Sequence, residues 1–198
     1  MHLHRIATFL LGLWFAGLVL VSYVATHNFQ RVDQILARPG AEYASKLAPL
    51  THAEARMVLR HQAAELNRDY FGSFEQVELV VGLLLCAALF SLQNLRTPWR
   101  LLGLAILALT LFSHFALTPD ITNIGRKLDF LDPAAQTPER TRFWQLHGVY
   151  SGVELSKMAL ILVLTGKLLI QRSRRSRLAE SRKQADLVND RYHSQVDR

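Results

Sequence analysis

Four side chains that could do chemistry lie close together in an otherwise apolar stretch, residues 143–164. They are His147, Tyr150, Glu154 and Lys157. At about 100° per residue on a helix, they fall within roughly 80° of one another and form one stripe. An imidazole, a phenol, a carboxylate and an ammonium on one helix face are the kinds of group that hold an ion or a small polar ligand inside a membrane.

Polar residues of the same kinds stand at the ends of three other apolar segments. Glu78 lies near the start of the second segment, His114 and Asp120 near the end of the third, and His27 just after the first. If successive segments cross a bilayer in alternating directions, all of these groups lie in the same half of it. The sequence therefore predicts one candidate ligand or ion site, made of His147, Tyr150, Glu154, Lys157, Glu78, His114, Asp120 and His27.

Two interpretations of Glu154 and Lys157 remain open. In one they belong to a ligand or ion site. In the other they form an ion pair at i, i+3 spacing that neutralises itself and helps to hold the helices together. The apolar run after Lys157, residues 158–170, is shorter than the roughly 20 residues that a crossing needs, so both charges must enter the membrane.

Three histidines, His27, His114 and His147, raise a further alternative, which is a haem or a metal ion held between helices. No HExxH pattern and no Glu-x-x-His pattern occurs on any apolar segment, and the sequence has no GxSxG elbow and no glycine-rich phosphate loop. We therefore expect no catalytic residue, no metal site, no cofactor and no enzymatic activity, and we keep haem or metal binding as the alternative.

Four apolar segments must position these groups. They cover residues of about 6–26, 75–94, 98–118 and 146–170, and each approaches or reaches the roughly 20 residues that span a bilayer. Tyr23 stands where a signal-peptide cleavage site needs a small residue, so we expect the first segment to be an uncleaved anchor. The expected fold is all-α, a polytopic membrane protein with a four-transmembrane-helix bundle over residues 1–171.

The first long loop, residues 27–74, carries helix signals of its own. The helical pattern of the first segment continues to Pro39, which stops it. Thr51 and Glu54 are spaced as a capping box, and apolar residues follow at helical spacing. We expect an external amphipathic helix over residues 51–71.

The second long loop, residues 119–145, carries the start signal of the last helix. Thr137 is a suitable N-cap residue, and Pro138 follows at the first helical position. The last helix should therefore begin well outside the bilayer and run about 50 Å, at 1.5 Å per residue, to a basic tail, residues 172–198.

The distribution of the +7 net charge predicts the orientation. Arg5 precedes the first segment, the short loop 94–100 is basic without an acidic residue, and the tail is basic directly after the last segment. Both termini should be cytoplasmic, so the polar level should face outward. We expect no nucleic-acid binding, because the tail lacks interleaved aromatic residues. The tail should contact anionic lipid through Arg172, Arg174, Arg175 and Arg177.

Four short motifs are LGLWFAG at residues 11–17, VATHNF at 24–29, TPD at 118–120 and RFxxLHG at 142–148. Together they resemble small four-helix membrane proteins related to transmembrane protein 205, whose bacterial members are described as a domain of unknown function. The similarity covers most of the chain except the tail. The resemblance implies a four-helix membrane fold and no particular biochemistry. In that family the segment after the His-Gly pair tends to be neutral, so Glu154 and Lys157 depart from its pattern.

Two functions fit these features. The first is an integral protein of a bacterial inner membrane that binds or transports a small ligand or ion. The alternative is a structural or assembly subunit, in which the polar level locks the helices and a membrane-protein partner docks on the loops or the tail. The lipid bilayer is the expected partner in both cases.

Overall fold

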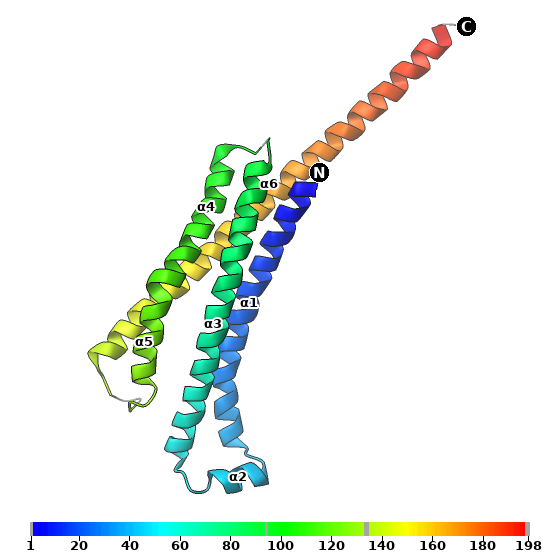
Figure 1. Cartoon of the computed structure of the whole chain (residues 1–198). Helices are drawn as coiled ribbons and strands as arrows, with labels where there is room; N and C mark the ends of the chain where they lie inside the picture. The colour runs from blue at the N-terminus through cyan, green and yellow to red at the C-terminus, as the bar shows by residue number, and fades with distance from the viewer. Residues whose placement is uncertain (1, 94, 133–134, 197–198) are drawn as a thin grey trace.

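The computed structural model describes residues 2–93, 95–132 and 135–196, and within these ranges the chain forms helices joined by short connections. Side chains are described up to Gln171 and at Ser181 and Gln184. No strand occurs in these ranges, so the all-α prediction is confirmed. The elements are α1 His2–Ala37, α2 Ala41–Leu47, α3 His52–Ser91, α4 Thr97–Phe112, the π-helical segment η1 Ser113–Leu117, α5 Thr118–Leu128 and α6 Pro138–Val196 (Figure 1).

Three helical stretches are long and apolar enough to cross a membrane: α1, α3 and the continuous stretch Thr97–Leu128. Between 28 % and 44 % of the most apolar part of each is buried inside the protein. Most of the apolar surface therefore faces away from the core, as it does in a helix that contacts lipid. The structure thus contains three of the predicted long apolar helices, each a candidate membrane span by its length and composition.

The capping box of α3 is confirmed. The Thr51 hydroxyl accepts a hydrogen bond from the Glu54 backbone N–H at 3.3 Å, and the Glu54 carboxylate accepts one from the Thr51 N–H at 2.8 Å. The helix that starts here does not end near residue 71, however, because α3 continues to Ser91. The external helix and the second apolar segment are one helix, since Gly72 alone is too weak a breaker to divide them.

The third long helix also extends further than expected, since α5 continues to Leu128 within the predicted loop. Pro119 explains the π-helical turn that precedes α5. A proline has no N–H to donate, and its ring excludes the carbonyl of the residue four positions earlier, so the helix widens for one turn. The start of α6 at Pro138 agrees with the prediction, and the Thr137 hydroxyl accepts a hydrogen bond from the Arg140 N–H at 3.2 Å.

Helices α1, α3, α4 and α6 contribute to one buried core. Gly82 of α3 lets the neighbouring helices approach closely, because a Cβ atom there would lie 2.9 Å from Leu107 and 3.0 Å from the Trp14 ring. The largest fully buried apolar side chains of this core are Leu11, Leu85, Leu89, Ile106, Ile161, Leu164 and Leu168.

The two ends of the molecule carry different connections. Figure 1 places the N-terminus, the α3–α4 turn and the emerging part of α6 at one end, and α2 and the α5–α6 connection at the other. Beyond the core, α6 continues as a helix to Val196, so the predicted tail is largely a continuation of this helix. The predicted lipid-contacting side chains of Arg172, Arg174, Arg175 and Arg177 lie outside the described part of the chain.

Candidate functional site

Lys157 on α6 is the centre of a buried group of charges. Its Nζ lies 2.9 Å from each carboxylate oxygen of Glu78 on α3 and 2.9 Å from Oε2 of Glu154. The Lys157 and Glu78 side chains are 0 % and 1 % exposed, and Glu154 is 14 % exposed. An ammonium has three N–H donors, so its capacity is met by three carboxylate oxygens.

Trp14 ties this group to α1. Its indole Nε1–H donates a hydrogen bond to Glu78 Oε1 at 2.6 Å, and both side chains are buried. The sequence pattern did not single out Trp14 as a site residue. The sequence feature that could have indicated it is the position of Trp14 inside an apolar segment, because a buried indole N–H needs a hydrogen-bond acceptor.

Glu75, one helical turn before Glu78, is a third buried carboxylate. Its Oε1 accepts hydrogen bonds from the hydroxyls of Thr118 and Tyr150, and its Oε2 lies 3.0 Å from Nδ1 of His114. Glu75 is fully buried, whereas the His114 side chain is 26 % exposed. Glu75 was absent from the predicted site, although it shares a helix face with Glu78.

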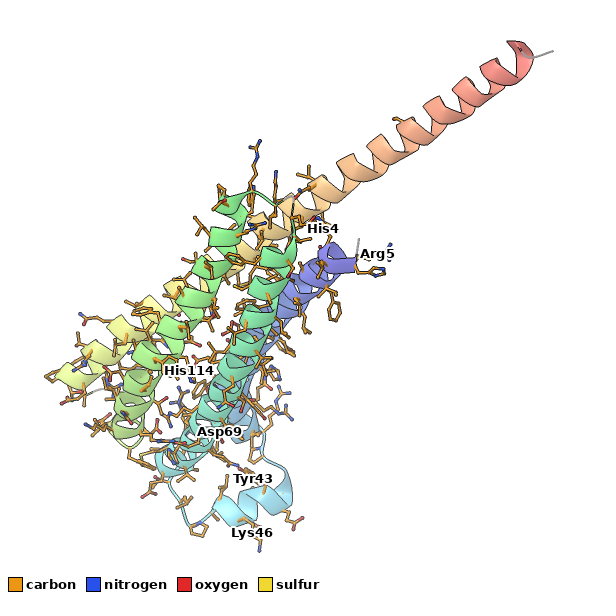
Figure 2. The ribbon with its side chains drawn as sticks, turned by 45° about the horizontal axis from the view of Figure 1, so that its top comes forward. His4, Arg5, Tyr43, Lys46, Asp69 and His114 are labelled. Atoms are coloured by element: carbon orange, nitrogen blue, oxygen red, sulfur yellow. The ribbon has the colours of Figure 1, made fainter. Side chains whose placement is uncertain are left out.

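The π-helical segment η1 positions His114 and Thr118, the two partners of Glu75 on this helix. His114 is the second residue of η1, after Ser113, and Thr118 follows the segment directly. Ser113 is buried, and its hydroxyl donates a long hydrogen bond of 3.4 Å to Oε1 of Glu154. Figure 2 labels His114 partway along the third long helix, away from Arg5 at one end and Lys46 at the other. We call Glu75, Glu78, Glu154 and Lys157, with their hydrogen-bond donors, the acidic cluster.

The acidic cluster has more carboxylates than ammonium groups. With Glu75, Glu78 and Glu154 ionised and Lys157 protonated, the four side chains carry a net charge of −2, from three negative charges and one positive. An uncompensated buried charge costs several kcal/mol, so added positive charge would stabilise a fully ionised cluster. Two protons, or one divalent cation, would make it neutral.

The structure brings together five residues of the predicted site: Glu78, His114, Tyr150, Glu154 and Lys157. The predicted ion pair of Glu154 with Lys157 is present, but it does not stand alone, because Glu78 on α3 contacts the same ammonium through both oxygens. The position of these residues along each helix was readable from the sequence, whereas the rotation of α3 towards α6 was not.

Three predicted residues lie outside the acidic cluster. His27 is exposed and stacks on Tyr23, with ring centroids 5.6 Å apart. The position facing α3 is taken instead by the next residue, Asn28, whose amide donates to Asn67 Oδ1 at 2.7 Å. One residue is about 100° on a helix, so the two side chains point in different directions.

Asp120 and His147 lie away from the cluster, at the end of the molecule where α6 diverges from α3. Asp120 pairs with Arg142 at 3.0 Å, and His147 is exposed and stacks on Phe143 with centroids 5.8 Å apart. The first turns of α6 run away from α3 towards the α5–α6 connection (Figure 1). The stripe that begins at His147 therefore meets α3 only from Tyr150 onward.

The three histidines considered for haem or metal binding have three different settings. Among the described residues, one group of His, Cys, Asp or Glu side chains has three ligand atoms within 4.8 Å of one another, and it consists of His61, Glu65 and Asp129. None of His27, His114 and His147 belongs to it.

That group is part of an ion-pair network between α3 and α5. Arg68 donates to both oxygens of Asp129, at 2.8 Å and 3.0 Å, and Arg126 donates to both oxygens of Glu65 at 3.0 Å. The hydrogen bond from Arg126 lowers the pKa of Glu65 from 4.5 to about 2. Both carboxylates already face a guanidinium group, so ion pairing explains the group better than a metal does.

The sequence reasoning missed this network entirely. Its visible sign was a pair of oppositely charged residues at i, i+3 on each of two helices, Glu65 with Arg68 and Arg126 with Asp129. Such pairs are common on exposed helix faces, so the sign is weak.

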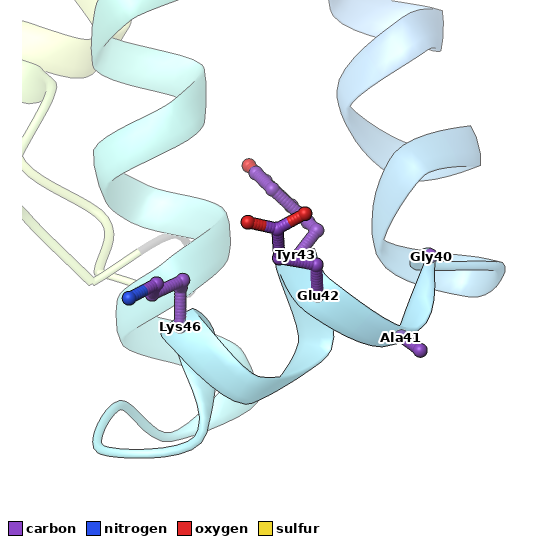
Figure 3. Close-up of a pocket in the computed structure, with 5 residues that line it drawn as sticks. All are labelled: Gly40, Ala41, Glu42, Tyr43 and Lys46. Atoms are coloured by element: carbon purple, nitrogen blue, oxygen red, sulfur yellow. The ribbon is translucent and has the colours of Figure 1, made fainter.

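A surface hollow lies at α2, away from the acidic cluster. Figure 3 shows its lining, which comes from one short helix and the residue before it. No residue of the acidic cluster contributes to it. The lining residues are Gly40, Ala41, Glu42, Tyr43 and Lys46.

Comparison with protein-family models, with curated proteins and with solved structures finds no match for this chain. The resemblance to the transmembrane protein 205 family remains a prediction from short motifs. Fold and site together define the class. It is an all-helical protein with three helices long and apolar enough to cross a membrane and, between its helices, a largely buried cluster of three carboxylates and one lysine.

Proposed function

We propose that the chain is an integral protein of a bacterial inner membrane, a four-helix membrane bundle in which residues 146–170 of α6 form the fourth span. Support comes from the core, to which α6 contributes Ile161, Leu164 and Leu168 beside residues of the other three spans. The exposed apolar side chains Leu162 and Val163 on the same helix suit contact with lipid.

The function that the site supports best is binding of a small cation in the acidic cluster, as part of ion binding or transport. The observation that carries this proposal is the charge imbalance: three carboxylates, of which Glu75 and Glu78 are buried and Glu154 is partly buried, share one cluster with the single ammonium of Lys157. Ionisable groups in membrane spans are expensive, and they commonly mark ion pathways and proton relays. Carboxylate and hydroxyl oxygens are also the ligands that hard cations prefer.

Thermal unfolding of the purified protein in lipid nanodiscs tests cation binding. A cation that binds the folded state alone raises the unfolding midpoint as its concentration increases. We expect the midpoint to respond to H⁺, Na⁺, K⁺, Mg²⁺ or Ca²⁺, and we expect Glu75→Gln to reduce that response. Glu42→Gln, on the exposed helix α2, is the control and should respond as the unaltered protein does.

Equal responses of the unaltered protein and Glu75→Gln to all five cations would overturn the proposal. A second candidate function would then take its place, because a specific observation favours it. The acidic cluster connects α1 through Trp14, α3 through Glu78 and α6 through Lys157, so it could serve only to lock the helices of a structural or assembly subunit. Such a subunit should migrate with a larger complex after extraction in mild detergent.

A further inference from the structure

The acidic cluster has two parts with different access to water. In the first part, the Lys157 ammonium contacts Glu78 and Glu154, and Trp14 donates to Glu78. Lys157 and Glu78 are shielded from solvent almost completely. The lysine is held by carboxylate oxygens from two helices, so this part is poorly suited to exchange its charge rapidly with water.

The second part is centred on Glu75. Its neighbours are the hydroxyls of Thr118 and Tyr150, which are neutral donors, and the ring of His114. Among the described contacts of Glu75, His114 is the one with two ring nitrogens, so that one nitrogen can accept a proton while the other donates one. About a quarter of the His114 side chain remains exposed, at 26 %, although Glu75 itself is fully buried. His114 thus connects a buried carboxylate with the surface.

The geometry favours a proton over a metal ion as the bound cation. A metal needs several ligand atoms converging on one point, typically six or so oxygens for Mg²⁺ or Ca²⁺. Among the described residues, the one group of three His, Cys, Asp or Glu residues whose ligand atoms all lie within 4.8 Å of one another is His61, Glu65 and Asp129, which is outside the acidic cluster. A proton needs a single acceptor and can move along hydrogen bonds that are already present.

We propose that the ion taken up by the acidic cluster is a proton, that Glu75 is its first buried acceptor, and that His114 carries it there from water. This inference rests on the cation binding proposed above. His114 takes a proton from water on Nε2, and the Nδ1–H that faces Glu75 passes to Oε2 across the 3.0 Å contact. Glu75 ends as a neutral acid, and His114 ends as a neutral ring with its proton on Nε2.

The charged and titratable groups around Glu75 fit this role. Glu78 on the same helix and Glu154 on α6 are negative and favour uptake of a proton, while Lys157 is already shared between those two carboxylates. The Tyr150 hydroxyl contacts Glu75 and lies one turn before Glu154 on α6. It therefore lies between the first acceptor and the next carboxylate.

The test is proton uptake by the full-length protein in nanodiscs after a rapid drop in pH. Infrared spectroscopy follows the carbonyl band of protonated carboxyl groups. We expect Glu75→Gln to remove one titrating carboxyl from the difference spectrum. We expect His114→Ala to slow the appearance of the band by about a hundredfold, a typical loss when a positioned acid–base group is removed, and free imidazole to restore part of the rate.

His147→Ala is the matched control, because His147 is exposed on α6 and stacks on Phe143 rather than contacting a carboxylate. It should leave both rate and amplitude unchanged. His114→Gln serves in place of His114→Ala if the latter fails to fold, and Glu75→Gln tests the acceptor independently of either.

The outcomes separate this inference from the proposed function. The proton route would be overturned if the carboxyl band of Glu75→Gln had the same amplitude as that of the unaltered protein. It would also be overturned if the band appeared in His114→Ala at the same rate as in the unaltered protein. A midpoint that responds to Na⁺, K⁺, Mg²⁺ or Ca²⁺, without titration of a buried carboxyl, would keep cation binding and reject the proton. A response to no ion, with no titrating buried carboxyl, would reject both.

Discussion

Lys157 lies in the proposed fourth span, where an unpaired charge would be costly, and its contacts explain how it is tolerated there. A lone ammonium at a helix centre in a bilayer costs about 3 kcal/mol on insertion scales. Here two carboxylates from different helices contact it, and a third carboxylate lies one turn from Glu78. The energetic consequence of removing any one charge therefore depends on which charges remain.

The first prediction follows from this sharing. Lys157→Met should lower the free energy of unfolding by about 3–5 kcal/mol, because it strands the Glu78 and Glu154 carboxylates. Glu154→Gln should lower the free energy of unfolding by a smaller amount, because Lys157 still pairs with Glu78. The double variant Glu154→Gln with Lys157→Met should not recover the loss, because Glu78 is left without its cation. Glu78→Gln with Lys157→Met should recover more of it, because the remaining carboxylate, Glu154, is partly exposed.

Reversible unfolding in mild detergent at neutral pH measures these four values as double-mutant cycles. Lys167→Met is the control, since the Lys167 ammonium lies over the Trp99 ring, 5.1 Å from its centroid. A stability of Lys157→Met equal to that of the unaltered protein would contradict the paired-charge account and would indicate that water reaches this position.

The second prediction concerns Glu65 in the network between α3 and α5. The folded-state pKa of about 2 lies below the usual 4.5, so the ionised carboxylate stabilises the fold above pH 4.5 and this contribution is lost as pH falls towards 2. The unfolding midpoint of the unaltered protein should therefore fall more steeply over that window than that of Glu65→Gln. Scanning calorimetry at stepped pH measures both curves.

Glu42→Gln provides the comparison, because Glu42 lies on the exposed helix α2. Its curve should follow that of the unaltered protein. Parallel curves for Glu65→Gln and the unaltered protein would mean that the Glu65–Arg126 contact does not persist in solution.

At the level of single residues, the sequence could predict the position of a residue along its helix but not the direction in which its side chain points. Charged residues inside apolar segments require partners at a similar level, which is why Glu78, Glu154 and Lys157 could be grouped. The same reasoning placed His27 and His147 with them, although both face elsewhere. A helical pattern gives the angles within one helix, and the rotation of one helix relative to another depends on packing that the pattern does not contain.

The helices are positioned by small residues and by local signals that the sequence shows well. The capping box at Thr51 and the start of α6 at Pro138 were predictable because each depends on side chains within three or four residues. The continuation of α3 and of the third long helix through the predicted loops was not, because neither stretch contains a strong helix breaker other than Pro119. That proline widens its helix into η1 instead of ending it.

The third prediction tests the close approach of α3 to its neighbours. Gly82→Ala should lower the free energy of unfolding by about 1–3 kcal/mol, the usual cost of overpacking. The added Cβ would lie 2.9 Å from the end of Leu107, which can move, and 3.0 Å from the rigid Trp14 ring, which also donates to Glu78. The same variant should therefore disturb the acidic cluster, and tryptophan fluorescence would report the change around Trp14.

Gly12→Ala is the matched control on α1. No atom lies within 4 Å of a Cβ built there, so the substitution should be neutral, or stabilising by up to about 1 kcal/mol from the better helix propensity of alanine. Equal effects of the two substitutions would show that helix propensity, and not packing at Gly82, controls the response.

The whole molecule combines an apolar exterior with a charge gradient between its ends. The N-terminus, the α3–α4 turn and the emerging α6 share one end (Figure 1), and that end carries Arg5, Arg96 and Arg100. Successive apolar helices alternate in direction, so the order of the apolar segments along the sequence predicted which connections share an end. The contact of α5 with α3 was not predictable, because it depends on ion pairs between residues 61 positions apart.

The fourth prediction is the orientation of the molecule in the membrane. The positive-inside rule expects the end with the termini to be cytoplasmic. A reporter domain that works only outside the cytoplasm should be active when it is fused after Pro39 or after Asp132. A reporter that works only in the cytoplasm should be active when it is fused after Pro98. Substituting Arg96 and Arg100 by glutamine should weaken this preference, since short-loop basic residues dominate it. If the Pro98 fusion is external instead, His114 would face the cytoplasm, and the acidic cluster would take up its cation from inside the cell.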